Sequence, residues 1–130
     1  MTLHHVGIAV ESIPRSAEQY RAALGLALAG DIVEDPIQKV RVAFVPAGNG
    51  TFIEFVEPAG PDSPVTRVLH KGGGLYHVCY QVSDLHAAIA RVQAAGGRLV
   101  SGPAPAKAFG GRSIAWVYTP DRSLVEFLAE

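Results

Sequence analysis

Two histidines and two glutamates stand inside otherwise apolar stretches of this sequence, at a regular spacing. His5 is followed 72 residues later by His77, and Glu54 is followed 72 residues later by Glu126. A carboxylate between apolar neighbours costs folding free energy if it is buried without a partner. Two imidazoles and two carboxylates that converge on one face would remove this cost by binding a divalent cation. The donor set suits Zn, Co, Ni, Mn or Fe(II).

Four protein ligands leave two positions of a six-coordinate cation for water or for substrate oxygens, which is typical of a catalytic rather than a structural site. Each residue alone has a simpler explanation, because a strand histidine can fill the core and a strand glutamate can face solvent. The match of all four at one offset favours metal binding over these separate explanations.

The same offset of 72 relates the two halves of the chain without a gap. Twelve of 58 aligned positions are identical, where about five would be expected by chance. The stretch 42–45 matches 114–117, and 53–56 matches 125–128. We therefore expect a single domain over residues 1–130. It contains two related modules, about 1–58 and 73–130, and a connection over 59–72.

Each half predicts the element order βαβββ. Ser12 is a plausible helix N-cap and Gly25 a natural stop, and Asp84 and Gly96 repeat this pattern. Strands are expected at 3–10, 26–33, 39–46, 51–57, 75–82, 98–101, 112–118 and 123–129. A hairpin turn is expected at 47–50, a short helix at 64–70, and no regular structure at 102–111. The predicted fold is α+β, with the two modules paired into a curved, mostly antiparallel eight-stranded sheet and the helices outside.

Composition excludes several classes of protein. Hydrophobic residues make up 48% and charged residues 18% of the chain, and the formal net charge is -1. This balance argues against disorder and against nucleic-acid binding. No apolar run is long enough for a membrane span, and the first ten residues lack the features of a signal peptide. The lone Cys79 favours a reducing compartment such as the cytoplasm.

Other polar and aromatic residues carry weaker signals. Strand alternation points His4 away from His5, His70 and His86 fall on predicted helices, and Cys79 reads as a small buried residue. Some aromatic residues can line a pocket or fill the core: Phe44, Tyr80 and Trp116. Some cations could meet anionic substrate groups or stay solvated: Lys39, Arg41, Lys71, Lys107 and Arg112.

The sequence resembles the vicinal oxygen chelate superfamily, and most of all its methylmalonyl-CoA epimerase and single-domain glyoxalase I-like members. The matching stretches cover essentially the whole chain: HHVGIAV (4–10), QKVRVAFVP (38–46), FIEFVEP (52–58), PDSPV (61–65), GLYHVCYQV (74–82) and LVEFL (124–128). The family's metal ligands fall on His5, Glu54, His77 and Glu126. These are the residues that the repeat singles out.

The resemblance implies a metal-dependent epimerase or isomerase, which removes a proton next to a carbonyl through a metal-stabilised enediolate. Glu126 is the expected base and Glu54 the alternative. The substrate would be an acyl-CoA thioester or a glutathione adduct, and the expected assembly is a homodimer. A glyoxalase I-like lactoylglutathione lyase, a metal-dependent dioxygenase or transferase, and a non-catalytic binding protein remain alternatives.

Overall fold

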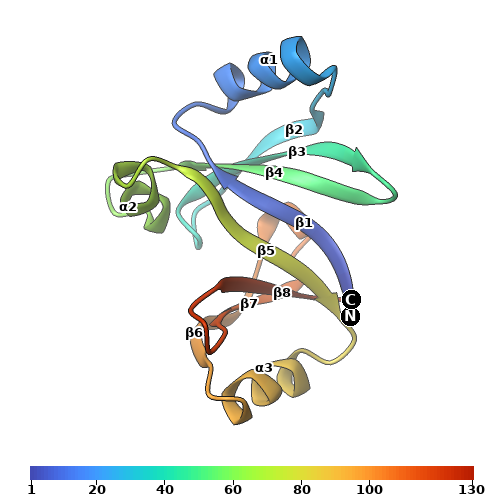
Figure 1. The fold of residues 1–130 in the computed structure, drawn as a ribbon, viewed down its shortest axis with the longest axis vertical. Coiled ribbons are helices and arrows are strands. Elements are labelled where there is room, and N and C mark those ends of the chain that lie inside the picture. The colour runs from blue at the N-terminus through green and yellow to red at the C-terminus, as the bar shows by residue number, and fades with distance from the viewer. The chain divides into compact units, whose positions relative to one another are not determined.

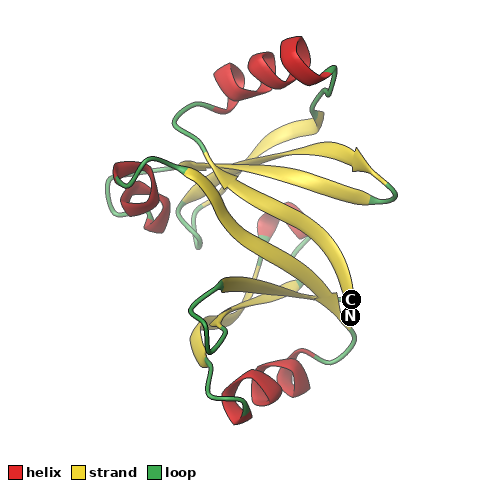
Figure 2. Ribbon diagram, viewed as in Figure 1, coloured by secondary structure: helices red, strands yellow, loops and turns green.

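The computed structural model describes all 130 residues, which form two compact units. The first unit comprises residues 5–76, and the second comprises residues 1–4 together with residues 77–130. Three α-helices, one 3-10 helix and eight strands make up the chain, and Figure 2 distinguishes helices from strands by colour. The α+β class and the βαβββ order of both modules are confirmed.

The first module has four strands in the order β2-β3-β4-β1. β1 and β4 are parallel, and the other two neighbouring pairs are antiparallel. Its elements are β1 (Thr2–Ala9), α1 (Ile13–Leu24), β2 (Ala29–Asp35), β3 (Val40–Gly48) and β4 (Thr51–Pro58), followed by α2 (Pro64–His70).

The second module repeats this pattern with the strand order β5-β8-β7-β6. β5 and β8 are parallel, and the remaining pairs are antiparallel. Its elements are β5 (Gly74–Val82), α3 (Leu85–Ala94), β6 (Arg98–Pro105), the 3-10 helix η1 (Lys107–Phe109), β7 (Ser113–Tyr118) and β8 (Leu124–Ala129).

Local chemistry explains where α1 begins and ends. The Ser12 hydroxyl accepts a hydrogen bond from the amide of Arg15 at 3.3 Å, and Gly25 adopts the left-handed conformation at φ 70°. Ser and Gly are the residues preferred at these two positions. In the strand pair that follows, Asn49 and Gly50 both have positive φ, as a tight hairpin turn requires. The predicted helix limits and hairpin are confirmed.

α1 and α3 each pack on one face of the strands of their own unit, so the opposite face is left for other side chains. In the first unit Ile13 of α1 packs with Val45 and Phe55, and Tyr20 makes an edge-to-face contact with Phe55 at 4.8 Å. In the second unit Ile89 of α3 packs with a corresponding cluster on β7 and β8. Figure 1 shows α1 beside β2–β4 and α3 beside β6–β8.

The predicted strand limits depart most from the structure at the start of β2 and at the end of β6. Residues 26–28 precede β2, because Leu26 and Leu28 pack against the α1 cluster before the strand starts at Ala29. Residues 102–111, expected to be irregular, continue β6 to Pro105 and then form η1. The glycine and prolines of this stretch hide the strand in the sequence, and the β6–β7 register is indeed interrupted twice. The short helix at 64–70 is confirmed.

The α1 core cluster should contribute strongly to stability. Phe55 is completely buried, so we expect Phe55→Ala to lower the free energy of unfolding by about 3–5 kcal/mol through lost burial and the cavity left behind. Urea unfolding followed by circular dichroism measures this change. Leu24→Ala is the control, because Leu24 is 61% exposed and its truncation should cost less than about 0.5 kcal/mol. Equal losses in the two variants would contradict the assignment of this core.

The longest helix in the structure has 12 residues, and no helix is long and apolar enough to cross a bilayer.

Candidate functional site

The first unit places His5 and Glu54 together on the face of its strands that α1 does not cover. Nε2 of His5 lies 3.3 Å from Oε1 of Glu54. On the parallel pair β1–β4 the residue opposite Glu54 is Gly7, two positions after His5 and therefore on the same face. The imidazole is fully buried and Glu54 is 5% exposed. The strand register thus produces a buried imidazole–carboxylate pair.

The second unit builds the same pair from the equivalent residues. Nε2 of His77 lies 3.5 Å from Oε1 of Glu126. Cys79 is the residue opposite Glu126 on β5–β8, again two positions after the histidine. Both residues are buried. The repeat in the sequence is therefore a repeat of geometry as well as of residue types.

An aromatic ring borders each pair. Phe44 stands opposite Glu54 on β3–β4, and its ring meets that of His5 edge-to-face with centroids 5.6 Å apart. Trp116 stands opposite Glu126 on β7–β8, and its ring meets that of His77 at 4.7 Å. Such contacts fix the orientation of an imidazole and replace water around it. Phe44 and Trp116 thus line the pairs, whereas Tyr80 packs against the α3 cluster.

The donor set and its spacing fit a divalent metal ion. Metal–nitrogen and metal–oxygen bonds of about 2.0–2.2 Å, at bond angles between 90° and 110°, hold two adjacent donors about 2.8–3.6 Å apart. The separations of 3.3 Å and 3.5 Å fall in this range. Each of the four residues offers one donor atom, and all four are buried. A buried carboxylate next to an imidazole can take up a cation without exposing either group to water.

His70, His86 and Cys79 lie where the sequence places them. His70 and His86 are exposed on α2 and α3. His4 contacts the ring of Phe109 edge-to-face. Cys79 takes part in no disulfide, and it is fully buried in an apolar cluster with Leu128.

Three of the cations expected as possible substrate contacts have protein partners. The Lys39 ammonium binds Asp62 at 2.7 Å. Arg41 binds Glu57 and Glu34, and Glu57 is the main reason that the pKa of Arg41 is raised. Arg112 donates to the carbonyl of Ala129 at 2.8 Å. These three side chains are therefore engaged by groups of the protein itself.

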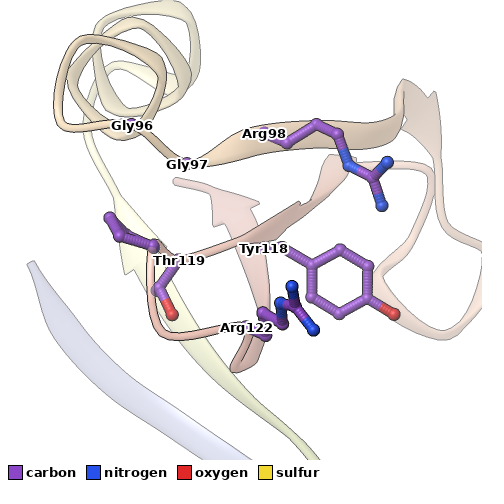
Figure 3. A pocket seen from close by; sticks show the side chains of 7 residues that line it. Gly96, Gly97, Arg98, Tyr118, Thr119 and Arg122 are labelled. Carbon is purple, nitrogen blue, oxygen red and sulfur yellow. The ribbon is translucent and has the colours of Figure 1, made fainter.

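A pocket of about 590 Å³ lies at one end of the second unit, and the sequence gives little sign of it. Two guanidinium groups and a phenol ring border it, from Arg98, Arg122 and Tyr118, and Figure 3 shows the three side chains gathered on one side. The residues come from the start of β6, the end of β7 and the following turn. The pocket depends on the β6–β7 register, which places Arg98 opposite Tyr118 and cannot be obtained from the sequence.

The fold and the two imidazole–carboxylate pairs define a class of protein. Residues 4–116 match the model of the Glyoxalase/Bleomycin resistance protein/Dioxygenase superfamily, and the chain belongs to this superfamily. The resemblance noted in the sequence, to the superfamily and to its epimerase branch, is confirmed.

Within this superfamily, similar curated proteins are epimerases of the isomerase class. The chain is 36% identical to the ethylmalonyl-CoA/methylmalonyl-CoA epimerase of Cereibacter sphaeroides, over 92% of this chain and 89% of that protein. It is 40% identical to the mitochondrial methylmalonyl-CoA epimerase of Mus musculus over 67% of this chain, a match that spans 49% of the mouse protein. The crystal structure of methylmalonyl-CoA epimerase from Mycobacterium tuberculosis superposes with a TM-score of 0.84 at 29% identity, covering 98% of this chain and 87% of that one.

Proposed function

We propose that this chain is a metal-dependent epimerase that inverts the carbon next to the carbonyl of a CoA thioester, with methylmalonyl-CoA or a close analogue as substrate. The observation that carries the proposal is the buried imidazole–carboxylate pair present in each unit at equivalent register. The relatives add the reaction class, because curated proteins similar over most of this chain are epimerases of such thioesters.

The metal ligands in this proposal are His5, Glu54, His77 and Glu126, which together hold one divalent ion, with Co, Ni, Zn and Mn as candidates. Support comes from the chemistry of the donors, from their burial, and from the donor spacing within each pair. When bound, such an ion would supply Lewis-acid stabilisation of the negative charge that develops on the carbonyl oxygen during proton removal.

Glu126 is the proposed base. Glu126 is 3% exposed and lies opposite Trp116 on β7–β8. Few water molecules are therefore close enough to compete with this carboxylate as proton acceptors. Proton transfer to a carboxylate in such a site is general base catalysis. Glu54 has the same surroundings in the first unit and is the alternative base. Trp116 would exclude water from a reacting carbon at Glu126, and Phe44 from one at Glu54.

Solvent-deuterium exchange tests the proposal directly. The protein is loaded with Co, Ni, Zn or Mn and incubated with methylmalonyl-CoA in D₂O, and incorporation at carbon 2 is followed by NMR. We expect catalysed incorporation that is lost on treatment with a chelator and returns on adding metal. In parallel, the methylglyoxal–glutathione adduct is offered as substrate. Turnover of the adduct without exchange into methylmalonyl-CoA would contradict the epimerase proposal and indicate a lactoylglutathione lyase.

The proposal includes a homodimer that works in a reducing compartment such as the cytoplasm. Such a compartment suits the single buried thiol, Cys79. Light scattering of the eluting protein in size-exclusion chromatography measures the assembly, and a mass of about one chain would contradict the dimer.

A further inference from the structure

The pocket bordered by Arg98, Tyr118 and Arg122 is separate from the two imidazole–carboxylate pairs, and its chemistry points to an anion. Neither guanidinium group has an ion-pair partner. Arg98 instead lies over the ring of Tyr118, with its central carbon 5.4 Å from the ring centroid. A planar guanidinium presents paired donors that match the oxygens of a phosphate group. Two such groups beside one ring favour a phosphorylated ligand that also has a flat part.

Hydrogen bonds within residues 119–123 shape the turn that carries Arg122. Asp121 accepts hydrogen bonds from the Thr119 hydroxyl and the Ser123 amide, and these bonds lower the pKa of its carboxyl. The amide of Arg122 donates to the carbonyl of Thr119 at 2.8 Å, and Arg122 has φ 67°. The one acidic side chain of this turn is therefore engaged within the turn. Its backbone bonds fix the position from which the Arg122 side chain extends.

The floor of the pocket depends on Gly97. A Cβ at this position would lie 2.4 Å from Val92 and 2.5 Å from the carbonyl of Tyr118. The glycine lets the end of α3 approach β7 closely. It thereby brings Arg98 opposite Tyr118 at the start of β6.

The pocket also lies in line with the proposed base. Tyr118 is two residues beyond Trp116 on β7, on the same face and about 7 Å further along the strand. Trp116 in turn stands opposite Glu126. A long, flexible substrate whose reacting carbon lies at Glu126 can therefore pass Trp116 and, with its arm bent rather than extended, place its far end at the two arginines.

We propose that the Arg98–Tyr118–Arg122 pocket binds the phosphate-bearing nucleotide end of a coenzyme A thioester, an inference that rests on the proposed function. The guanidinium groups pair with phosphate oxygens, and the Tyr118 ring provides a face on which the adenine base stacks. This pocket, and not the metal site, then distinguishes a CoA ester from a small acyl compound.

The first test is a binding titration that needs no turnover. Adenosine 3′,5′-bisphosphate is titrated calorimetrically into wild type and into Arg98→Gln, Arg122→Gln and Arg91→Gln. We expect each pocket variant to bind at least tenfold more weakly, because a charge-assisted bond to phosphate is lost. The control Arg91→Gln, which alters an exposed arginine of α3 outside the pocket, should bind as wild type does. Equal affinity in all four proteins, or no binding by wild type, would overturn the proposal.

Inorganic pyrophosphate distinguishes a nucleotide pocket from a plain phosphate site. We expect wild type to bind pyrophosphate at least tenfold more weakly than the nucleotide, and Tyr118→Leu to remove most of that difference. Pyrophosphate binding as tight as nucleotide binding would overturn the assignment to a nucleotide.

Kinetics with a shortened substrate complete the test. The two pocket variants should raise the KM for methylmalonyl-CoA about tenfold, with kcat unchanged and no effect on methylmalonyl-pantetheine, which lacks the nucleotide. If no thioester reacts while the titration behaves as expected, the epimerase proposal fails and the nucleotide pocket stands. If both substrates lose activity alike in the pocket variants, the pocket assignment fails and the epimerase stands.

Discussion

Glu126→Gln should lower the rate of deuterium exchange into methylmalonyl-CoA about 10³-fold at saturating metal, because it removes the proposed base. The amide keeps the size of the side chain but cannot accept the proton. Exchange at carbon 2 in D₂O is the measurement, with metal content determined on the same samples. Saturating metal is necessary, because the amide is also a weaker ligand than the carboxylate.

Glu54→Gln is the matched control for this experiment. Glu54 has the same residue type, the equivalent register and similar burial, with 5% exposure against 3% for Glu126. If Glu54 acts only as a metal ligand, Glu54→Gln should weaken metal binding about as much as Glu126→Gln does. With the site saturated, we expect Glu54→Gln to keep exchange within about tenfold of wild type. A larger loss of the deuterium-exchange rate in Glu54→Gln than in Glu126→Gln would contradict this assignment and make Glu54 the base.

The buried pairs could be predicted from the sequence because the repeat supplies a second copy of each observation. One histidine in an apolar strand has several explanations, but a histidine and a glutamate that recur at one offset must share a reason. The strand order of each unit then explains how each histidine comes to lie beside its glutamate. Parallel pairing of β1 with β4, and of β5 with β8, brings His5 to Glu54 and His77 to Glu126.

The arginine pocket could not be predicted in this way, because it has no counterpart in the repeat. The offset of 72 aligns Arg98 with Leu26 and Arg122 with Gly50. The pocket arises from close packing of α3 on β7 at Gly97 and from the local turn around Arg122, and neither leaves a periodic pattern. The extension of β6 to Pro105 escaped prediction for a similar reason. Its pairing with β7 compensates for residues whose own propensities disfavour a strand.

His77→Ala should reduce bound metal from about one ion per chain to less than about 0.1, because an imidazole donor is lost from a four-ligand site. The same change should abolish the stabilisation that metal confers. At a free metal concentration 100-fold above the Kd, that stabilisation is about 2.7 kcal/mol, or roughly 10 °C in Tm for a chain of this size. Elemental analysis and thermal unfolding with and without metal measure both effects, and neither depends on knowing the substrate.

Two further variants make this result specific to the proposed site. His5→Ala should behave like His77→Ala, because each removes the imidazole from an equivalent pair. His86→Ala should retain the metal and the Tm shift, since His86 is exposed on α3. If His5→Ala kept a full equivalent of metal while His77→Ala lost it, the four-residue site would be refuted in favour of one built on the second unit alone. A single site with ligands from both halves of the repeat requires that His5→Ala and His77→Ala both lose the metal. It also requires that His86→Ala retain the metal.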